Sequence, residues 1–249
     1  METHEGTPIL LVDDEADLLE VLAMSLSHSG YAPFTASSGE EALEAVRDRR
    51  FAVVVTDIRM PGMGGGALLD SLKSTDAANP AVILITAFED IGVEEAHDRG
   101  AEALVLKPFD LAELCAAIER SILPPTERWS QPLHQGPLSH IDLRYESLMA
   151  ASRDKVLGVG RGGFYFLLSE EKLLPGAVVE FSLSMETGPL ERLSGTGILR
   201  WMARASADDA PVASGVEFEY LDPPSRECFA RWVEAQQPTA FIPSPRART

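Results

Sequence analysis

Four short apolar runs in the first half of the chain end in residues that suit phosphate or metal chemistry. Asp13 and Asp14 follow the first run, Asp57 ends another, and Thr86 and Lys107 end two more. If the runs are parallel strands, their carboxyl ends meet at one edge of a sheet, where ligands bind. Three carboxylates there would repel one another unless a cation joined them, and hard oxygen ligands suit Mg²⁺. Since a carboxylate can attack a phosphoryl group, the residues predict a metal-assisted aspartyl-phosphate site.

Each of these side chains taken alone also has a simpler structural explanation. Asp13 and Asp14 could merely cap the helix that follows them, and Lys107 could be an ordinary surface lysine. Thr86 alone indicates nothing, because threonine is frequent in strands. The combination of these residues with Asp57, each at the end of an apolar run, is what favours chemistry over capping.

Buried strands and amphipathic helices alternate around these side chains. Capping residues predict two helix starts, at Ser38 with Glu41 and at Asp110 with Glu113. Near-continuous apolar character predicts strands at 8–14, 31–36 (the weakest), 52–57, 81–87 and 101–108. Five such strands alternating with helices predict a doubly wound α/β domain with a five-stranded parallel sheet.

Composition narrows the classes of function. The chain has 249 residues and a net charge of −18, of which −15 falls on residues 1–123 and only −3 on 124–249. An acidic first half opposes nucleic-acid phosphates, so we expect no DNA binding. The longest apolar runs are too short to span a bilayer, and the first residues lack a secretory signal, so we expect no membrane insertion. Cys115 and Cys228 lie apart within helical patterns, which favours a reducing cytoplasm.

The segments LLVDDEAD, VVVTDIRMPGMGG, ILITAF and LVLKPF occur in this order between residues 8 and about 122. They resemble the receiver domain of two-component response regulators, which has a flavodoxin/CheY-like fold. The resemblance implies that Asp57 is the phosphoacceptor. It also implies that Asp14 and Asp57 bind Mg²⁺ together with the backbone carbonyl of Arg59, and that Asp13 orients a metal-bound water.

The same resemblance assigns roles to the last two strands. Lys107 would bind a phosphate oxygen, ahead of a cis bond to Pro108. Thr86 would turn toward the phosphoryl group. Many receivers carry Phe or Tyr three residues before the lysine, whereas this chain has Leu104, an atypical residue at the aromatic switch position. We therefore expect signalling to run through the packing of the fourth and fifth helices.

The second half of the chain has a different organisation. Residues 121–137 contain four prolines and no apolar period, which is typical of a linker. Apolar residues then alternate at 177–186 and 215–221, and 222–237 shows helical periodicity. The pattern predicts an all-β small antiparallel barrel with a closing C-terminal helix. The predicted organisation is a receiver at 1–123, a linker at 124–137, a β-barrel domain at 138–237 and a disordered tail at 238–249.

Three glycines in this second domain, Gly158, Gly160 and Gly163, have the spacing of a nucleotide-binding loop. A strand-like FYF follows them instead of a helix, so a dinucleotide site is not expected. The segments VLGVGRGGFYF, LLPGAVVEFSLSM, LSGTGILRWMAR and ASGVEFEYLDPPSRECFARWVE lie between about 138 and 236. They resemble a PilZ domain, a small barrel that in many members binds cyclic di-GMP. The resemblance places Gly158 and Gly160 where binding members carry an acid and a serine, and Gly163 alone keeps the pattern. No two arginines in 124–153 have the RxxxR spacing, so standard cyclic di-GMP binding is not expected.

These resemblances together predict a response regulator. A sensor histidine kinase would phosphorylate Asp57, and the PilZ-like domain would pass the signal to an unknown protein partner. One alternative is a cyclic di-GMP effector whose degenerate loop still binds the nucleotide, and another is a scaffold that is never phosphorylated. Beyond self-phosphorylation and dephosphorylation we expect no enzyme activity, because the second half shows no recognisable catalytic motif.

Overall fold

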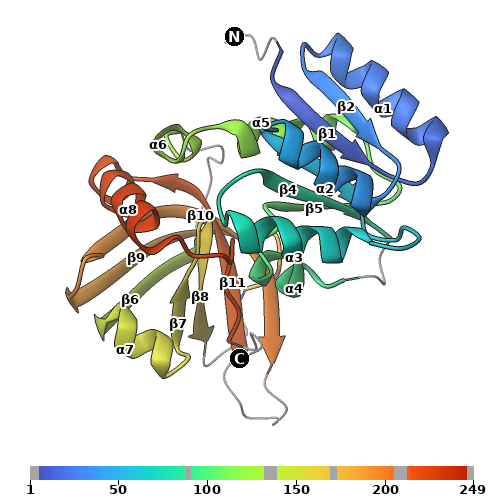
Figure 1. Cartoon of the computed structure of the whole chain (residues 1–249). Helices are drawn as coiled ribbons and strands as arrows, with labels where there is room; N and C mark the ends of the chain where they lie inside the picture. Colours follow the sequence, from blue (N-terminus) through green and yellow to red (C-terminus); the bar gives the residue numbers. More distant parts are fainter. Residues whose placement is uncertain (1–5, 88–90, 132–138, 169–172, 205–211, 246–249) are drawn as a thin grey trace. The chain divides into compact units, whose positions relative to one another are not determined.

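The protein forms two compact units, each considered by itself. A computed structural model describes residues 6–87, 91–131, 139–168, 173–204 and 212–245 (Figure 1). The first unit comprises Met1–Gly92 and Arg99–Ile122, and the second comprises Val93–Asp98 and Leu123–Thr249. Helix α4 (Val93–Asp98) follows the fourth strand in the sequence but groups with the second unit, which the predicted division at residue 123 did not anticipate.

The first unit is the predicted α/β domain with a five-stranded parallel sheet, in the order β2-β1-β3-β4-β5. The strands are β1 (Pro8–Val12), β2 (Ala32–Ala36), β3 (Val53–Asp57), β4 (Ala81–Thr86) and β5 (Ala103–Leu106). The helices of this unit are α1 (Ala16–His28), α2 (Gly39–Asp48), α3 (Gly65–Thr75) and α5 (Leu111–Ile122). β3 and β4 are buried along their whole length, as near-continuous apolar runs require.

Alternation along the strands divides the core of this unit between the two faces of the sheet. Ile9, Ile83 and their same-face neighbours pack with the buried leucines of α1 and the buried face of α5. Leu10 and Leu84, which point the other way, are also fully buried. Residues on both faces thus hold the strands in place and fix where each strand ends.

A buried ion pair joins α3 to the residue that precedes β5, and hydrogen bonds from the pair reach the start of β4. Lys73 Nζ lies 3.1 Å from Glu102 Oε1 and donates to the carbonyl of Pro80 at 2.8 Å. The other carboxylate oxygen of Glu102 accepts from the backbone N–H of Val82 at 2.7 Å. Both side chains are almost completely buried, so each charge is compensated by the other.

The second unit is a β-rich half-barrel with a terminal helix, built on one six-stranded sheet in the order β6-β9-β10-β11-β8-β7. Its strands are β6 (Ser139–Ser147), β7 (Leu157–Val159), β8 (Gly163–Leu168), β9 (Val178–Thr187), β10 (Arg192–Arg204) and β11 (Val212–Leu221). Its helices are α4, α6 (Pro125–Arg128), α7 (Leu148–Arg153) and α8 (Pro223–Gln236). The prediction of a fully antiparallel barrel was wrong in one respect, because β6 pairs with β9 in parallel.

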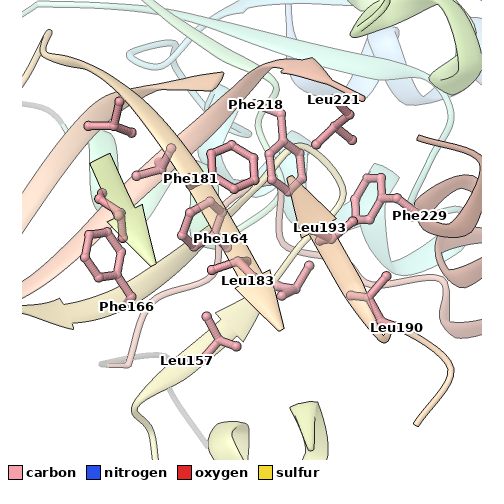
Figure 2. Packing of buried hydrophobic residues seen from close by; sticks show 14 of the residues in the cluster. Leu157, Phe164, Phe166, Phe181, Leu183, Leu190, Leu193, Phe218, Leu221 and Phe229 are labelled. Atoms are coloured by element: carbon pink, nitrogen blue, oxygen red, sulfur yellow. The ribbon is translucent and has the colours of Figure 1, made fainter. Parts of the chain in front are cut away.

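Packed phenylalanine and leucine side chains lie in the core of the second unit (Figure 2). Phe164, Phe181 and Phe218 meet with ring centroids 4.9 to 5.8 Å apart, and Phe229 brings α8 onto Phe218 at 5.0 Å. Each fully buried phenylalanine contributes about 1.5–3 kcal/mol by removal from water, with a further increment for the edge-to-face pairs. Helix α8 is therefore part of this core, as expected for the closing C-terminal helix that the sequence predicts.

Two segments predicted to lack structure instead pack into the second unit. The predicted linker contains α6 and Trp129, which is 3% exposed and packs edge-on against Phe218 and Phe229. Residues 132–138 of that linker lie outside the described part of the chain. The predicted disordered tail, 238–249, contains Phe241 and Ile242, which are 3% and 0% exposed. Both predictions weighed proline content too heavily, because a few large apolar residues are enough to anchor a short segment.

Among the described residues, no helix is long and apolar enough to cross a membrane.

Candidate functional site

Three predicted site residues meet at the carboxyl edge of the parallel sheet. Lys107 Nζ lies 2.6 Å from Asp57 Oδ1 and 3.3 Å from Asp13 Oδ2. Asp57 is the last residue of β3, Asp13 follows β1, and Lys107 follows β5, so the three come from separate strands. Both carboxylates are buried, at 3% exposed for Asp13 and 6% for Asp57. Topology therefore brings together groups that are up to 94 residues apart in sequence.

Backbone N–H groups fix the two carboxylates. The N–H of Arg59 donates to Asp57 Oδ2 at 2.7 Å, so both oxygens of Asp57 have a donor. The N–H of Glu15 donates to Asp13 Oδ1 at 2.9 Å, and the N–H of Asp13 donates to the carbonyl of Ala36. The sequence identified Asp57 and Asp13 but not these donors, because backbone groups carry no residue-type signal.

The remaining predicted residues lie around this cluster. Thr86 is fully buried at the end of β4, where its hydroxyl donates to the carbonyl of Ala87 at 2.8 Å and its carbonyl accepts from the N–H of Lys107. The Lys107–Pro108 bond is cis, as predicted. Leu104 is half-buried on β5 opposite Leu84 of β4. Thr86 thus ends the strand next to Lys107, whereas Leu104 lies two residues before the paired strand ends. The switching roles of both residues stay predictions.

The electrostatics of the cluster favour cations. Burial lowers the pKa of Lys107, but the hydrogen bond to Asp57 and the charges of Asp13 and Asp57 outweigh it, so that the pKa lies above its ordinary value. Two buried carboxylates therefore already hold one positive charge.

The donors of the cluster also fit Mg²⁺ in kind, since carboxylate oxygens are its preferred ligands. Asp14 is exposed beside the buried pair. Within the described residues, no three His, Cys, Asp or Glu side chains gather as a ready metal site, and Lys107 contacts both Asp13 and Asp57. The Mg²⁺ role of Asp13, Asp14, Asp57 and the Arg59 carbonyl is accordingly a prediction that rests on the chemistry of the donors.

The glycine loop, residues 158–163, is buried and close-packed in the second unit. A Cβ added to Gly160 would lie 2.6 Å from the carbonyl oxygens of Ala240 and Phe241, and one on Gly158 would lie 2.4 Å from the Tyr165 ring. A Cβ on Gly163 would lie 2.1 Å from the carbonyl oxygen of Val216. All three glycines of the predicted motif are thus needed for close packing. The missing side chains leave room for the protein's own backbone.

Known proteins resemble about half of this chain. The sequence model of the family described as "Response regulator receiver domain" matches residues 9–119. The transcriptional regulatory protein ZraR of Escherichia coli O157:H7 is 37% identical over 121 residues, which are 48% of this chain and 27% of that protein. The DNA-binding transcriptional regulator NtrC of Escherichia coli (strain K12) is 38% identical over 115 residues, 46% of this chain and 24% of that protein. The chain thus spans about a quarter of the length of these curated relatives.

Solved structures match the same part of the chain. The receiver domain of NtrX from Brucella abortus is 35% identical and covers 46% of this chain and 97% of its own, with a TM-score of 0.43. The response regulator protein TrrA from Thermotoga maritima, solved in complex with Mg(2+)-BeF, is 30% identical and covers 46% of this chain and 98% of its own, also with a TM-score of 0.43.

Proposed function

Residues 9–119 form a response regulator receiver domain of two-component signalling, and from this premise we propose that Asp57 accepts a phosphoryl group from a sensor histidine kinase. The observation that carries the proposal is the convergence of Asp57, Asp13 and Lys107, with Asp57 held at both carboxylate oxygens. A nucleophile already fixed by its neighbours loses little freedom on reaching the transition state. The proposal includes no other enzymatic activity.

The proposed transfer uses the side chains of the cluster as follows. One Asp57 oxygen attacks the phosphorus atom, the bond from phosphorus to the kinase imidazole nitrogen breaks, and the electron pair of that bond stays on the nitrogen. Lys107, which lies 2.6 Å from Asp57, shifts its ammonium to an oxygen of the incoming phosphoryl group. Thr86, at the neighbouring strand end, donates to another phosphoryl oxygen. Bound Mg²⁺ would offset the charge gathered by phosphoryl oxygens and carboxylates.

The second unit serves, in this proposal, as a PilZ-like output domain that contacts a protein partner. Two features support an output without standard cyclic di-GMP binding. The glycines at 158 and 160 offer no side-chain groups to a nucleotide, and Gly160 faces the carbonyl oxygens of Ala240 and Phe241. Calorimetry with the full chain tests this part, since saturable cyclic di-GMP binding at micromolar ligand would favour the nucleotide effector instead.

The relatives' names include DNA-binding transcriptional regulators. We propose an output without DNA, because the acidic balance of the chain opposes phosphate contacts. The proposed location is the cytoplasm, where two-component phosphotransfer from a kinase takes place.

Phosphorylation is tested by incubating the protein with Mg²⁺ and acetyl phosphate and measuring its intact mass. We expect one added phosphate on wild type and none on Asp57→Asn. Asp48→Asn, which removes an exposed carboxylate at the end of α2, should label like wild type. Absence of label on wild type, or equal label on Asp57→Asn, would favour the unphosphorylated scaffold.

A further inference from the structure

The glycine loop of the second unit binds a strap of the same chain, Thr239–Ser244, through its backbone. The N–H of Arg161 donates to the carbonyl of Ala240 at 2.9 Å, and the N–H of Gly162 donates to the carbonyl of Phe241 at 2.9 Å. Arg161 Nε adds a bond to the carbonyl of Thr239 at 3.2 Å. Backbone hydrogen bonds of this kind bind the main chain of a segment, whatever its side chains are.

The loop accepts the strap because it lacks side chains. A Cβ on Gly162 would lie 2.0 Å from the Phe241 ring, closer than any real contact, and one on Gly160 would meet the strap's backbone. Gly162 was not among the glycines that the nucleotide-like spacing selected. Its absent side chain leaves the space that Phe241 fills, so the loop is shaped for a peptide.

An apolar cluster on the outer face of the sheet receives the strap's side chains. Phe241 and Ile242 pack with Tyr165 of β8, Trp201 of β10 and neighbouring alanines. This cluster is separate from the main core, because Tyr165 points away from Phe164 and Phe166 along the alternating strand. The strap thus covers an aromatic surface that the fold of the sheet does not itself bury.

Helix α4, which belongs to the same unit, forms the second wall around the strap. The N–H of Phe241 donates to the carbonyl of His97 at 2.8 Å, and the two rings lie 5.5 Å apart between centroids. The N–H of Ser244 donates to Asp98 Oδ1 at 2.8 Å. The glycine loop binds the carbonyl of Phe241 and α4 binds its N–H, so the strap lies between the loop and the helix.

We propose that the glycine loop, the Tyr165–Trp201 surface and α4 form a peptide-binding groove whose built-in occupant is the strap. The groove recognises a segment in which an aromatic and an aliphatic residue are followed by proline, as in Phe241, Ile242 and Pro243. A partner segment of this chemistry enters only when the strap leaves. This inference does not depend on phosphorylation of Asp57, since every group that it uses lies in the second unit.

A fluorescently labelled peptide with the sequence of residues 238–245 tests the groove by anisotropy. We expect saturable binding at micromolar concentrations to a chain shortened after residue 238, and binding at least tenfold weaker to the full chain, whose strap competes at high effective concentration. Gly162→Val in the shortened chain should abolish binding. Gly92→Val is the matched control, because a Cβ at that exposed glycine meets open space.

The variants also separate a ligand from a structural staple. Far-UV circular dichroism establishes whether the shortened chain keeps its fold, and full-length Phe241→Ser, which loosens the strap without removing it, is the second test protein. We expect both to stay folded and to bind the peptide. A folded shortened chain that does not bind, binding unaffected by Gly162→Val, or unfolding of both proteins would overturn the proposal.

Discussion

Replacing Lys73 by methionine would remove the ammonium that forms a buried ion pair with the carboxylate of Glu102. Methionine keeps the length and the apolar character of the lysine stem but removes the ammonium, which lies 3.1 Å from Glu102 Oε1 and 2.8 Å from the Pro80 carbonyl. Removing one partner from a buried ion pair usually costs about 3–5 kcal/mol. We therefore expect a large loss of stability in the first unit.

Part of this loss comes from the Pro80 carbonyl, which accepts from the Lys73 ammonium at 2.8 Å. A buried acceptor that loses its donor usually costs about 1–3 kcal/mol.

Urea unfolding can report this loss for the first unit alone. All three tryptophans, Trp129, Trp201 and Trp232, belong to the second unit, so their fluorescence serves as an internal control while circular dichroism follows the whole chain. Arg50→Met, which removes an exposed positive charge from the first unit, should stay within about 0.5 kcal/mol of wild type. A deficit of Lys73→Met below about 1 kcal/mol at pH 7 would show that the ion pair does not stabilise the first unit as expected.

Two further changes should affect the second unit in a measurable way. Burial, with the nearby Tyr145 and Asp98, raises the pKa of Tyr165 to about 12. Between pH 10 and pH 12 the free energy of unfolding of wild type should then fall by up to about 2.7 kcal/mol, a loss that Tyr165→Phe should not show. Urea unfolding followed by tryptophan fluorescence measures both proteins, and parallel losses would contradict the prediction. Asp222 Oδ1 accepts from the N–H of Ser225 as the N-cap of α8. Asp222→Ala should cost about 1 kcal/mol in the same assay, with Asp222→Asn near wild type, and equal losses would exclude the capping role.

The sequence predicts that three side chains of the candidate site meet, because topology does most of the positioning. Asp13, Asp57 and Lys107 each lie at the end of a buried parallel strand, and such ends must meet at one edge. The pattern does not predict which oxygen Lys107 contacts, since this depends on rotamers and on backbone donors such as Arg59. Nor does it predict that α4 groups with the second unit, because its short run Val93–Asp98 carries no signal for its packing partners.

The second unit was less predictable because its structure depends on contacts between distant residues. Alternation identifies a half-buried strand such as β9 but not its neighbours, so the parallel pairing of β6 with β9 was missed. In the strap, proline and serine indicate disorder, while the apolar pair Phe241 and Ile242 is the only signal of packing. Such a pair is ordered only if a surface such as Tyr165 and Trp201 is available, which a local pattern cannot show.

The parallel pairing of β6 with β9 also determines when β6 can fold while the chain is being synthesised. Ser139 lies opposite Val179, so the ribosome must add about 40 more residues before β6 has a partner. At about 5–20 residues per second, this takes roughly 2–8 s. During that interval β6 would expose an unpaired edge with Ile141, Leu143 and Tyr145 along one face. The nascent chain is therefore most open to misassembly or chaperone binding between the emergence of β6 and that of β9.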